Sequence, residues 1–249
     1  MILRSRNGAA WYQFEHLAQF PEIDHGVFPR TAGSSAAPFD RLNVSLSVGD
    51  APDAVARNRR LVSRCLGAEA LVFVSQVHGA DVRVVEDGLT PETAADALAT
   101  ARPGKFLAVQ VADCQAILIY DPRRRVVANV HAGWRGSIAG IAARTVEVLG
   151  RRFGCAAGDL LVGIGPSLGP CCAEFVNYRT EIPRELWGYR RDAVFFDFWQ
   201  ITRDQLRDAG VAGEHIRDSG WCTRCHTERF FSYRGEKQTG RFPAVIGLR

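Results

Sequence analysis

The sequence predicts a layered α/β or α+β fold, and three observations lead to that prediction. The chain has 249 residues, of which 47% are apolar and 23% are charged, as in an ordinary globular protein with a sizeable core. Apolar, β-branched runs alternate with segments of helical spacing, which is the pattern of sheets covered by helices. The length fits one large domain or two small ones, and no internal repeat or long low-complexity linker divides the chain.

The first part of the chain predicts a long loop and then a helix. Residues 29–43 are rich in Pro, Gly and Ser and predict the loop. Between Asp53 and Leu66 the apolar residues recur at helical spacing, and Pro52 and the Asp53 carboxylate stand near the start of this helix. A second loop is predicted over residues 87–105, where turn residues surround a short alanine-rich helix.

The middle of the chain predicts short strands that end at polar or small residues. Residues 71–86 predict two strands around a turn at His78 and Gly79. Residues 106–121 predict two more strands, separated by a break at residues 112–114.

The next segment predicts a strand that leads directly into a helix. In residues 126–150 the strand turns at His131, and Gly150 stands where a helix would stop. Residues 160–170 predict another short strand that runs into a loop rich in Gly and Pro.

The composition disfavours a membrane or secreted protein. No run approaches the roughly 18 uninterrupted apolar residues of a membrane helix. The first twenty residues mix charges and aromatic residues and lack the apolar core of a signal peptide. The seven cysteines are an odd number at scattered positions, so we expect reduced thiols in a cytoplasmic protein.

The net charge of +4 does not by itself predict a nucleic-acid partner. Of the 31 basic residues 29 are arginine, and this bias is more simply explained by the composition of an Arg-rich proteome than by a nucleic-acid partner. The one dense basic run, Arg123 to Arg125, follows Asp121 and Pro122 and predicts a solvated turn between strands. A nucleic-acid footprint needs clustering on one face, so we expect no nucleic-acid partner.

Three polar residues stand at the predicted strand ends: His78, Cys114 and His131. Their long separations mean that only the tertiary structure could bring them together. Two imidazoles and one thiolate suit a borderline-soft ion such as Zn²⁺, and three protein ligands leave a fourth position open. Each residue alone is more often a packed or surface group, but their common setting beside small residues favours a shared site.

The segment after His131 predicts an anion site. A strand leads into Gly133 and Gly136, and a helix is expected to begin around Ser137. Backbone amides at a helix N-terminus, together with Arg135, would attract an anion. The alternative is a tight turn that needs glycine and carries a structural tryptophan.

Cys222, Cys225 and His226 follow the C-x-x-C-H pattern of covalent haem attachment. Haem is disfavoured because Met1 is the only methionine and no export segment is apparent. A structural zinc on these three residues is a second interpretation, with its fourth ligand unassigned. The third interpretation is that the two cysteines are packed in the protein and the histidine lies at the surface.

The chain resembles the YfiH-like family from about residue 24 onward. The segments that carry the resemblance include VSQVHGADV, ADCQAILIYDP, VANVHAGWRGSIAG, VGIGPSLGPCC and FFSYRGEKQTGR. The earlier segments HGVFPRTAG and LNVSLSVGD, with Asn58 and Arg59, also fit. The family has been described as laccase-domain or multicopper polyphenol oxidases, as peptidoglycan-editing factors and as purine nucleoside phosphorylases. The C-x-x-C-H spacing of WCTRCH departs from the family pattern.

The resemblance implies a single domain over residues 1–249, with mixed β-sheets flanked by helices, and it assigns two sets of site residues. The implied zinc ligands and catalytic residues are His78, Cys114 and His131. The residues implied to lie near the substrate are Arg30, Asn43 and Arg135.

The implied activity is zinc-dependent phosphorolysis of adenosine, inosine, guanosine and methylthioadenosine, with deamination of adenosine. Zinc lowers the pKa of water toward roughly 7, which would allow attack on C6 of adenine. Phosphorolysis needs a phosphate aligned at the ribose carbon, for which the ion, the helix terminus and Arg30 or Arg135 could serve. The expected partners are a purine nucleoside and phosphate, and the expected form is a cytoplasmic monomer or small homo-oligomer.

Three alternatives remain open. A copper polyphenol oxidase follows from the laccase description, although several coppers need more histidines than the six present. A cysteine or zinc amidohydrolase would use Cys114 as nucleophile and His131 or His78 as base, with a peptidoglycan precursor as substrate. A non-catalytic binding module is the third. The sequence identifies neither the physiological substrate nor the residue that shuttles the proton, although Asp113 is adjacent to Cys114.

Overall fold

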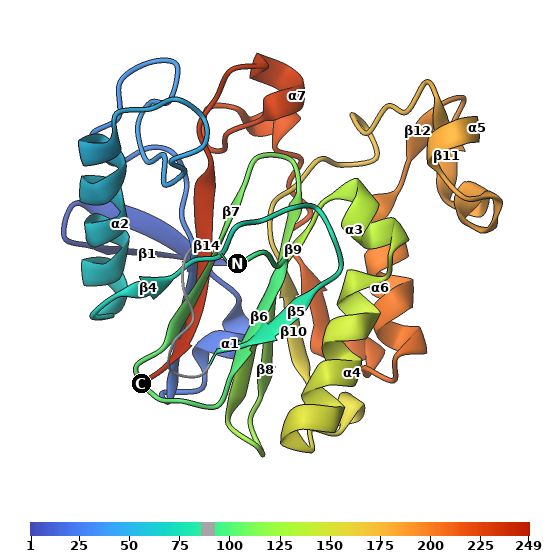
Figure 1. The fold of residues 1–249 in the computed structure, drawn as a ribbon, viewed down its shortest axis with the longest axis horizontal. Helices are drawn as coiled ribbons and strands as arrows, with labels where there is room; N and C mark the ends of the chain where they lie inside the picture. The colour runs from blue at the N-terminus through green and yellow to red at the C-terminus, as the bar shows by residue number, and fades with distance from the viewer. Residues whose placement is uncertain (86–92) are drawn as a thin grey trace.

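The computed structural model describes residues 1–85 and 93–249, and two six-stranded sheets form its frame (Figure 1). In spatial order, the first sheet contains β1 (Ile2–Arg6), β2 (Ala9–Gln13), β3 (Ile23–Val27), β14 (Phe242–Leu248), β7 (Phe106–Val111) and β4 (Leu71–Val72). The second contains β13 (Ile216–Asp218), β10 (Leu161–Ile164), β8 (Gln115–Asp121), β9 (Val126–Ala132), β6 (Ala97–Thr100) and β5 (Val82–Val84). Both sheets mix parallel and antiparallel neighbours, so the predicted α+β class with mixed sheets is confirmed.

Helices flank the two sheets, and a small two-stranded ribbon lies beside them. The helices are α1 (Glu15–Ala18), α2 (Pro52–Leu66), α3 (Trp134–Ile138), α4 (Ile141–Phe153), α5 (Tyr178–Glu181), α6 (Phe198–Asp208) and α7 (Tyr233–Glu236). The ribbon pairs β11 (Arg190–Asp192) with β12 (Phe195–Phe196). No helix in the part of the chain that the structure describes is both long and apolar enough to cross a membrane.

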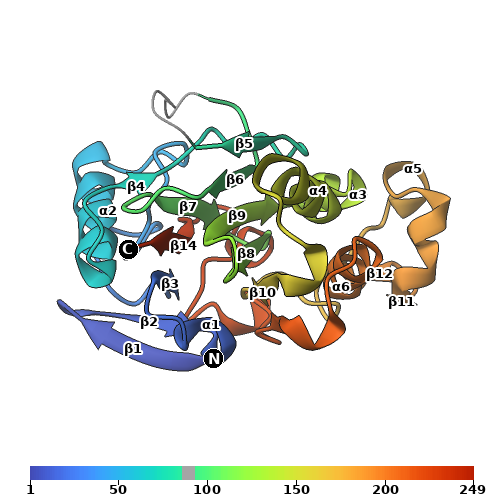
Figure 2. The ribbon, with the colours of Figure 1, turned by 90° about the horizontal axis from the view of Figure 1, so that it is seen from below.

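The sheets pack face to face, with helices outside both of them (Figure 2). One core cluster lies between the sheets and joins side chains such as Leu107, Leu118 and Phe242. A second cluster packs α4 and α6 against the outer face of the second sheet, and a third packs α2 against the first sheet. Strands β8 and β9 are therefore buried on both faces, which explains their nearly continuous apolar sequences.

A buried amide joins the two sheets at their centre. Asn129 on β9 is fully buried, and its Nδ2 donates to the carbonyl oxygens of Leu107 on β7 and Ala244 on β14, both at 2.9 Å. A polar group that is buried so deeply is stabilising only when it is hydrogen-bonded. This contact therefore helps to set the position of the second sheet against the first.

Most predicted elements are present, with three corrections. The predicted helix from Asp53 is α2, and the expected strand–break–strand is β7, residues 112–114 and β8. Residues 97–100 of the expected alanine-rich helix instead form β6, because pairing with β5 and β9 buries this small-residue segment completely. The beginning of that expected loop and helix lies outside the described residues.

The other two corrections concern the helical segment after β9. The helix begins at Trp134 rather than around Ser137, and it is divided into α3 and α4 at Gly140, which has a left-handed backbone. It continues through Gly150 and ends before Gly154, whose φ of 68° suits a left-handed helix cap.

Candidate metal centre and substrate cavity

The three predicted strand-end residues lie together at one end of β8 and β9. Cys114 directly precedes β8, and His131 lies on β9, where the antiparallel register sets it opposite Ala116. His78 comes from the loop between β4 and β5. The structure thus brings together all three members of the predicted triad, which no local spacing could have joined.

The donor atoms of the triad are close enough to share one ion. All three lie within 4.8 Å of one another, and Cys114 Sγ is 3.9 Å from His78 Nε2. The imidazole rings of His78 and His131 meet edge to face, with centroids 4.8 Å apart. Nitrogen and sulfur ligands of a tetrahedral zinc ion lie about 3.6 Å apart, so the chemistry and the spacing of these donors both fit zinc.

Asp96, which the sequence analysis missed, holds the triad in place. Its carboxylate accepts the backbone N–H groups of Val77, His78 and Gly79 at 3.2, 2.9 and 2.7 Å. It also accepts a hydrogen bond of 2.7 Å from His131 Nδ1, which leaves Nε2 of that ring for a metal. A lone acid in an alanine-rich segment was the available clue, but interpreting that segment as a helix concealed it.

The electrostatics of the triad favour a thiolate beside an imidazolium when no metal is bound. Burial alone would raise the pKa of Cys114, but the neighbouring His131 and His78 rings outweigh it and lower that pKa to about 6. Burial alone would lower the pKa of His131, but the Cys114 thiolate and the Asp96 carboxylate raise it to about 9. Metal binding at this site would therefore release a proton from His131.

Gly133 is required by close packing inside the triad. A Cβ atom at this position would lie 2.7 Å from His78 Cδ2 and 3.2 Å from Cys114 Sγ. Gly136, one turn later, is equally confined, since a Cβ there would lie 2.8 Å from the Gly79 carbonyl oxygen. The glycines that the sequence analysis interpreted as turn residues thus allow the loops of the site to approach one another.

The triad opens into a cavity of about 800 Å³, which is large enough for a nucleoside-sized molecule. Aromatic side chains line part of its wall, namely Trp134, Phe175, Phe198 and Tyr233. Three buried polar atoms on lining residues find no partner among the described residues: Gln110 Oε1, Gln115 Oε1 and Ser137 Oγ. Buried polar groups are nearly always hydrogen-bonded, but these three atoms have almost no accessible surface, so they lie behind the cavity wall and do not face a ligand directly.

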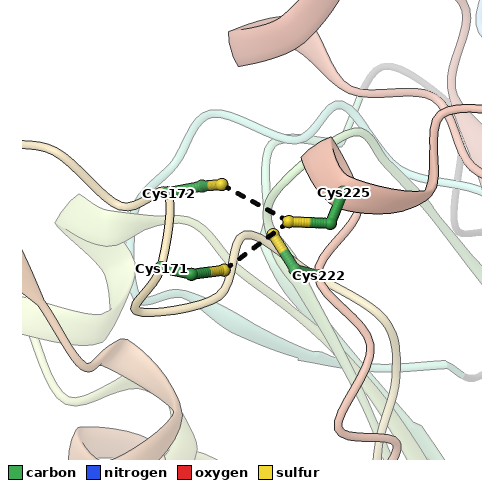
Figure 3. A group of neighbouring side chains, drawn as sticks. All are labelled: Cys171, Cys172, Cys222 and Cys225. Carbon is green, nitrogen blue, oxygen red and sulfur yellow. Dashed lines mark hydrogen bonds between the residues drawn. The ribbon is translucent and has the colours of Figure 1, made fainter.

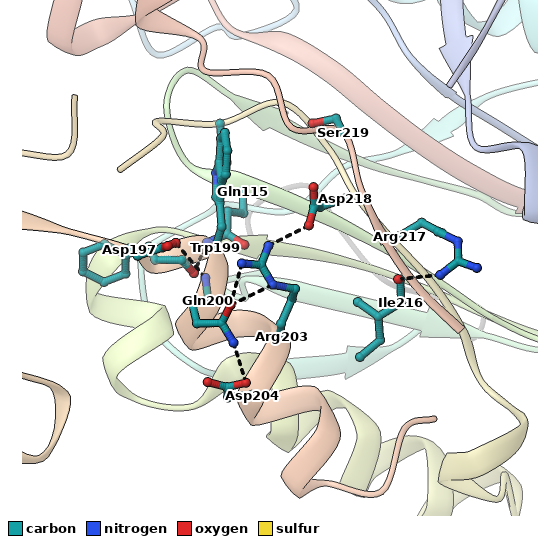
Figure 4. Close-up of polar contacts among 12 residues, drawn as sticks. Gln115, Asp197, Trp199, Gln200, Arg203, Asp204, Ile216, Arg217, Asp218 and Ser219 are labelled. Carbon is teal, nitrogen blue, oxygen red and sulfur yellow. Dashed lines mark hydrogen bonds and ion pairs between the residues drawn. The ribbon is translucent and has the colours of Figure 1, made fainter. Parts of the chain in front are cut away.

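Gln115 is held at this wall by the start of α6. Its Nε2 donates to the Phe198 carbonyl oxygen at 2.9 Å, and Asp197 caps the same helix by accepting from the Gln200 backbone N–H (Figure 4). Arg203 on α6 then binds Asp218 of β13 at 2.6 Å. The helix is thereby tied to the second sheet, and the unpaired oxygen of Gln115 has a fixed position.

The cavity is positively charged. Three guanidinium groups line it, those of Arg135, Arg234 and Arg241. Asp113 is the one acid among the described lining residues. Its carboxylate is already engaged, because it accepts from the hydroxyls of Thr223 and Ser232 and from the Arg234 backbone N–H.

Asp113 is therefore a poor candidate for shuttling a proton, and the cavity suits an anion. Of the three arginines, only Arg135 was predicted as a site residue. Its guanidinium stacks 4.1 Å from the ring centroid of Trp134. Arg234 and Arg241 lie in the C-terminal segment FFSYRGEKQTGR, which carried part of the family resemblance, but neither was selected there as a site residue.

Arg30 and Asn43 lie behind the cavity, outside the set of described residues that line it. Arg30 is buried and binds Glu236 at 2.7 Å, at the end of the helix that carries Arg234. Asn43 is fully buried, and its Oδ1 accepts from the backbone N–H of Arg241 at 2.9 Å. Both residues thus contact the segments that carry Arg234 and Arg241, and their place near the substrate stays a prediction.

The comparisons with known proteins agree with this architecture. A family model described as multi-copper polyphenol oxidoreductase laccase matches residues 24–249. The protein named purine nucleoside phosphorylase YlmD of Geobacillus stearothermophilus is 36% identical to this chain, covering 90% of the chain and 89% of YlmD. The protein named purine nucleoside phosphorylase YfiH of Escherichia coli is 34% identical, covering 88% and 91%. The chain belongs to the YfiH-like family.

Solved structures of YfiH-like proteins have the same fold. A Bacillus licheniformis hypothetical protein, YfiH, superposes with a TM-score of 0.89 at 30% identity, and 99% of each chain is covered. The crystal structure of YlmD from Geobacillus stearothermophilus gives 0.87 at 33% identity, covering 100% of this chain and 99% of YlmD. The resemblance inferred from the sequence motifs is therefore confirmed over the whole fold.

Proposed function

We propose that this YfiH-like protein is a zinc-dependent purine nucleoside phosphorylase. The observation that carries the proposal is one cavity that combines a three-donor metal site, aromatic walls and three arginines. The names of the curated relatives support the same choice, since they are called purine nucleoside phosphorylases at about 35% identity. The cofactor, the ligands and the nucleosides accepted are part of the proposal.

His78, Cys114 and His131 are the residues that would hold the ion. One thiolate and two imidazoles form a donor set common to catalytic zinc sites, and the cavity beside them leaves a coordination position open. Bound zinc would supply Lewis acidity and would lower the pKa of a water molecule. Copper is the less favoured metal because the other four histidines lie outside this cluster, whereas a multicopper centre needs several histidine groups.

The arginines that line the cavity would bind the phosphate. Arg135, Arg234 and Arg241 line the same cavity, and guanidinium groups match phosphate oxygens in a planar, two-bond geometry. The Nη1 atoms of Arg234 and Arg241 donate to backbone carbonyl oxygens, so their other N–H groups would bind the phosphate. By fixing the phosphate, they would bring it within reach of the ribose carbon. Arg30 and Asn43 are positioning residues in this proposal, because they hold Glu236 and the Arg241 backbone respectively.

The aromatic wall would bind the purine base. Trp134, Phe175, Phe198 and Tyr233 line the cavity, and aromatic rings stack on a flat base. The same arrangement would accept adenosine, inosine, guanosine and methylthioadenosine, which share the purine ring. Deamination of adenosine is a second activity of this proposed site, since the metal and the base would share one cavity.

The test is to incubate zinc-loaded protein with adenosine or inosine, with and without phosphate. We expect phosphate-dependent release of the free base together with ribose 1-phosphate, and formation of inosine from adenosine without a need for phosphate. If phosphate does not accelerate base release, the phosphorylase proposal is wrong. Oxidation of phenols by a copper-loaded preparation, or cleavage of a muropeptide precursor, would instead favour the oxidase or amidohydrolase alternatives.

Arg135→Ala tests the phosphate site. We expect the KM for phosphate to rise by about tenfold or more, because one charge-assisted contact contributes about 1.5–3 kcal/mol. The KM for the nucleoside should change little. Arg144→Ala is the control, since Arg144 lies on α4 outside the described cavity lining. Unchanged phosphate kinetics in Arg135→Ala would mean that Arg234 and Arg241 bind the anion without Arg135.

The cytoplasmic location of the protein and its state as a monomer or small homo-oligomer remain predictions.

A further inference from the structure

A second cluster of ligand-type side chains lies outside the cavity that binds the proposed substrate. It consists of four cysteines on two loops that are distant in sequence: Cys171, Cys172, Cys222 and Cys225 (Figure 3). Their four sulfur atoms all lie within 4.8 Å of one another. None of the described residues in this cluster is joined in a disulfide, since all seven cysteines of the chain are free thiols.

We propose that these four cysteines bind one zinc ion in a closed, structural site. The geometry supports this assignment, because four sulfur ligands at about 2.3 Å from a tetrahedral zinc lie about 3.8 Å apart. Cys225 Sγ lies 3.7 Å from Cys171 Sγ and 3.6 Å from Cys172 Sγ. Sulfur atoms this close enclose a single ion, whereas an iron–sulfur cluster must separate its cysteines across several metal atoms.

The placement of the cysteines also differs from that of packed thiols. Cys171 and Cys225 are exposed, although free cysteine is among the most buried residue types and exposed thiols are open to oxidation. Cys222 and Cys225 have the C-x-x-C spacing that supplies two ligands from one turn of a zinc site. A bound ion would explain why two cysteines of the same cluster are exposed, because both would serve as ligands.

The local backbone is already arranged around Cys222. The Gly169 backbone N–H donates to Cys222 Sγ at 3.3 Å, which helps to stabilise negative charge on that sulfur. Gly169 is closely packed, because a Cβ atom there would lie 3.0 Å from the Trp199 ring and 3.1 Å from Cys222 Cβ. Ser167 bridges the two loops, since its N–H donates to Trp221 and its carbonyl oxygen accepts from Thr223.

This cluster replaces the zinc site considered from the C-x-x-C-H pattern. His226 was the third candidate ligand there, but the metal-binding group contains Cys171 and Cys172 in its place. The Nδ1 atom of His226 lies 3.3 Å from a Glu228 carboxylate oxygen instead. In this proposal the cysteine pair on the other loop supplies both the third and the fourth ligand.

A zinc ion at this position would brace the wall of the cavity. The cysteine pair follows Leu168, whose N–H donates to the Asp113 carbonyl oxygen at 2.8 Å. Between the other two cysteines lies Thr223, whose hydroxyl donates to the Asp113 carboxylate at 2.6 Å. Both loops are thus fastened to the residue beside Cys114, and the ion would hold them to each other.

The first test counts metal and thiols in the purified protein. We expect two zinc ions per chain, and seven reactive thiols after denaturation without reductant. The double variant Cys171→Ser with Cys225→Ser should lose one zinc and keep the other. Cys65→Ala is the matched control, because Cys65 lies on α2 and is buried against the first sheet, and it should keep both ions. A zinc content that the double variant leaves unchanged, or fewer than seven thiols because of a disulfide, would contradict the proposal.

The second test keeps the four cysteines intact and removes the other site. Cys114→Ala should still bind one zinc ion, and the same variant loaded with Co²⁺ should show the intense visible absorption of tetrahedral thiolate-bound cobalt. This result does not depend on the enzymatic activity, so it would stand even if the phosphorylase proposal failed. A zinc-free Cys114→Ala protein, or a single iron with ferric–thiolate colour, would overturn the assignment.

Discussion

The two clusters of possible metal ligands are built in different ways. The triad lies at the ends of paired strands, and Asp96 binds both the loop of His78 and the ring of His131. The cysteine cluster lies on two loops, outside the named strands and next to the surface. One cluster takes its geometry from the core of the protein, whereas the other would take its geometry from the ion itself.

This difference in construction predicts which of the two metal sites can take part in catalysis. The triad supplies three donors beside a cavity, so a bound ion would keep an open coordination position for water or substrate. The cysteine cluster supplies four thiolates and would leave no position open. We therefore expect the first site to determine activity and the second to determine stability, and the following variants test that distinction.

The largest expected effect on activity comes from Cys114→Ala. We expect loss of the zinc at the triad and a decrease in kcat/KM of about a thousandfold or more, because a metal ion supplies several kcal/mol of transition-state stabilisation. The variant with Cys171→Ser and Cys225→Ser should lose at most about tenfold in activity while its Tm falls by several degrees. Steady-state kinetics and calorimetry compare the two. Equal losses of activity would remove the distinction between the sites.

Gly133→Ala should break the triad without replacing any ligand. The added Cβ would lie 2.7 Å from the His78 ring, so the ring must move away from Cys114 and His131. Because a displacement of about 1 Å can reduce a catalysed rate by about 100-fold, we expect a loss of that size together with weaker metal binding. Gly188→Ala is the control, since a Cβ at Gly188 meets no atom within 4 Å. Wild-type activity in Gly133→Ala would contradict this packing argument.

Asp96→Asn should weaken the triad by a smaller amount. The amide keeps the shape of the side chain but loses the charge that orients and polarises His131, so we expect zinc affinity to fall by about 10–100-fold. Competition with a chelator of known affinity measures this change. The cysteine cluster should keep its zinc in the same variant, and release of both ions together would indicate general unfolding instead.

The pH dependence of alkylation separates the two kinds of cysteine in metal-free protein. The His131 and His78 rings outweigh burial and lower the pKa of Cys114 to about 6, whereas burial raises the pKa of Cys172 to about 11. The thiolate is the reactive form, so alkylation of Cys114 should rise through about pH 6 and level off above it. Alkylation of Cys172 should still be rising at pH 9.

Mass spectrometry of each peptide follows both reactions, and zinc should protect both residues. Parallel pH profiles for the two residues would contradict this prediction. In Asp96→Asn the alkylation rate of Cys114 should level off at a higher pH than in the wild type. The reason is that the His131 imidazolium, which stabilises the thiolate, loses its carboxylate partner.

The sequence by itself predicted most of the elements, because these depend on local patterns, and it indicated the triad from residue types at strand ends. Buried strands appear as apolar runs, and a break in such a run places a side chain at a sheet edge. His78, Cys114 and His131 each stand at such a break, so their residue types alone suggested a shared ion. The family motifs surround the same three residues, and the comparisons confirm the family.

Only the tertiary structure decided what supports these residues. Asp96 reaches His131 across 35 positions, and Cys171 meets Cys225 across 54. Arg241 lies at the cavity because it directly precedes β14, which crosses the centre of the first sheet, and its sequence motif alone did not indicate this position. The physical reason is that helices and strands arise from neighbouring residues, whereas the pairing of strands and the docking of loops depend on the packing of the whole chain.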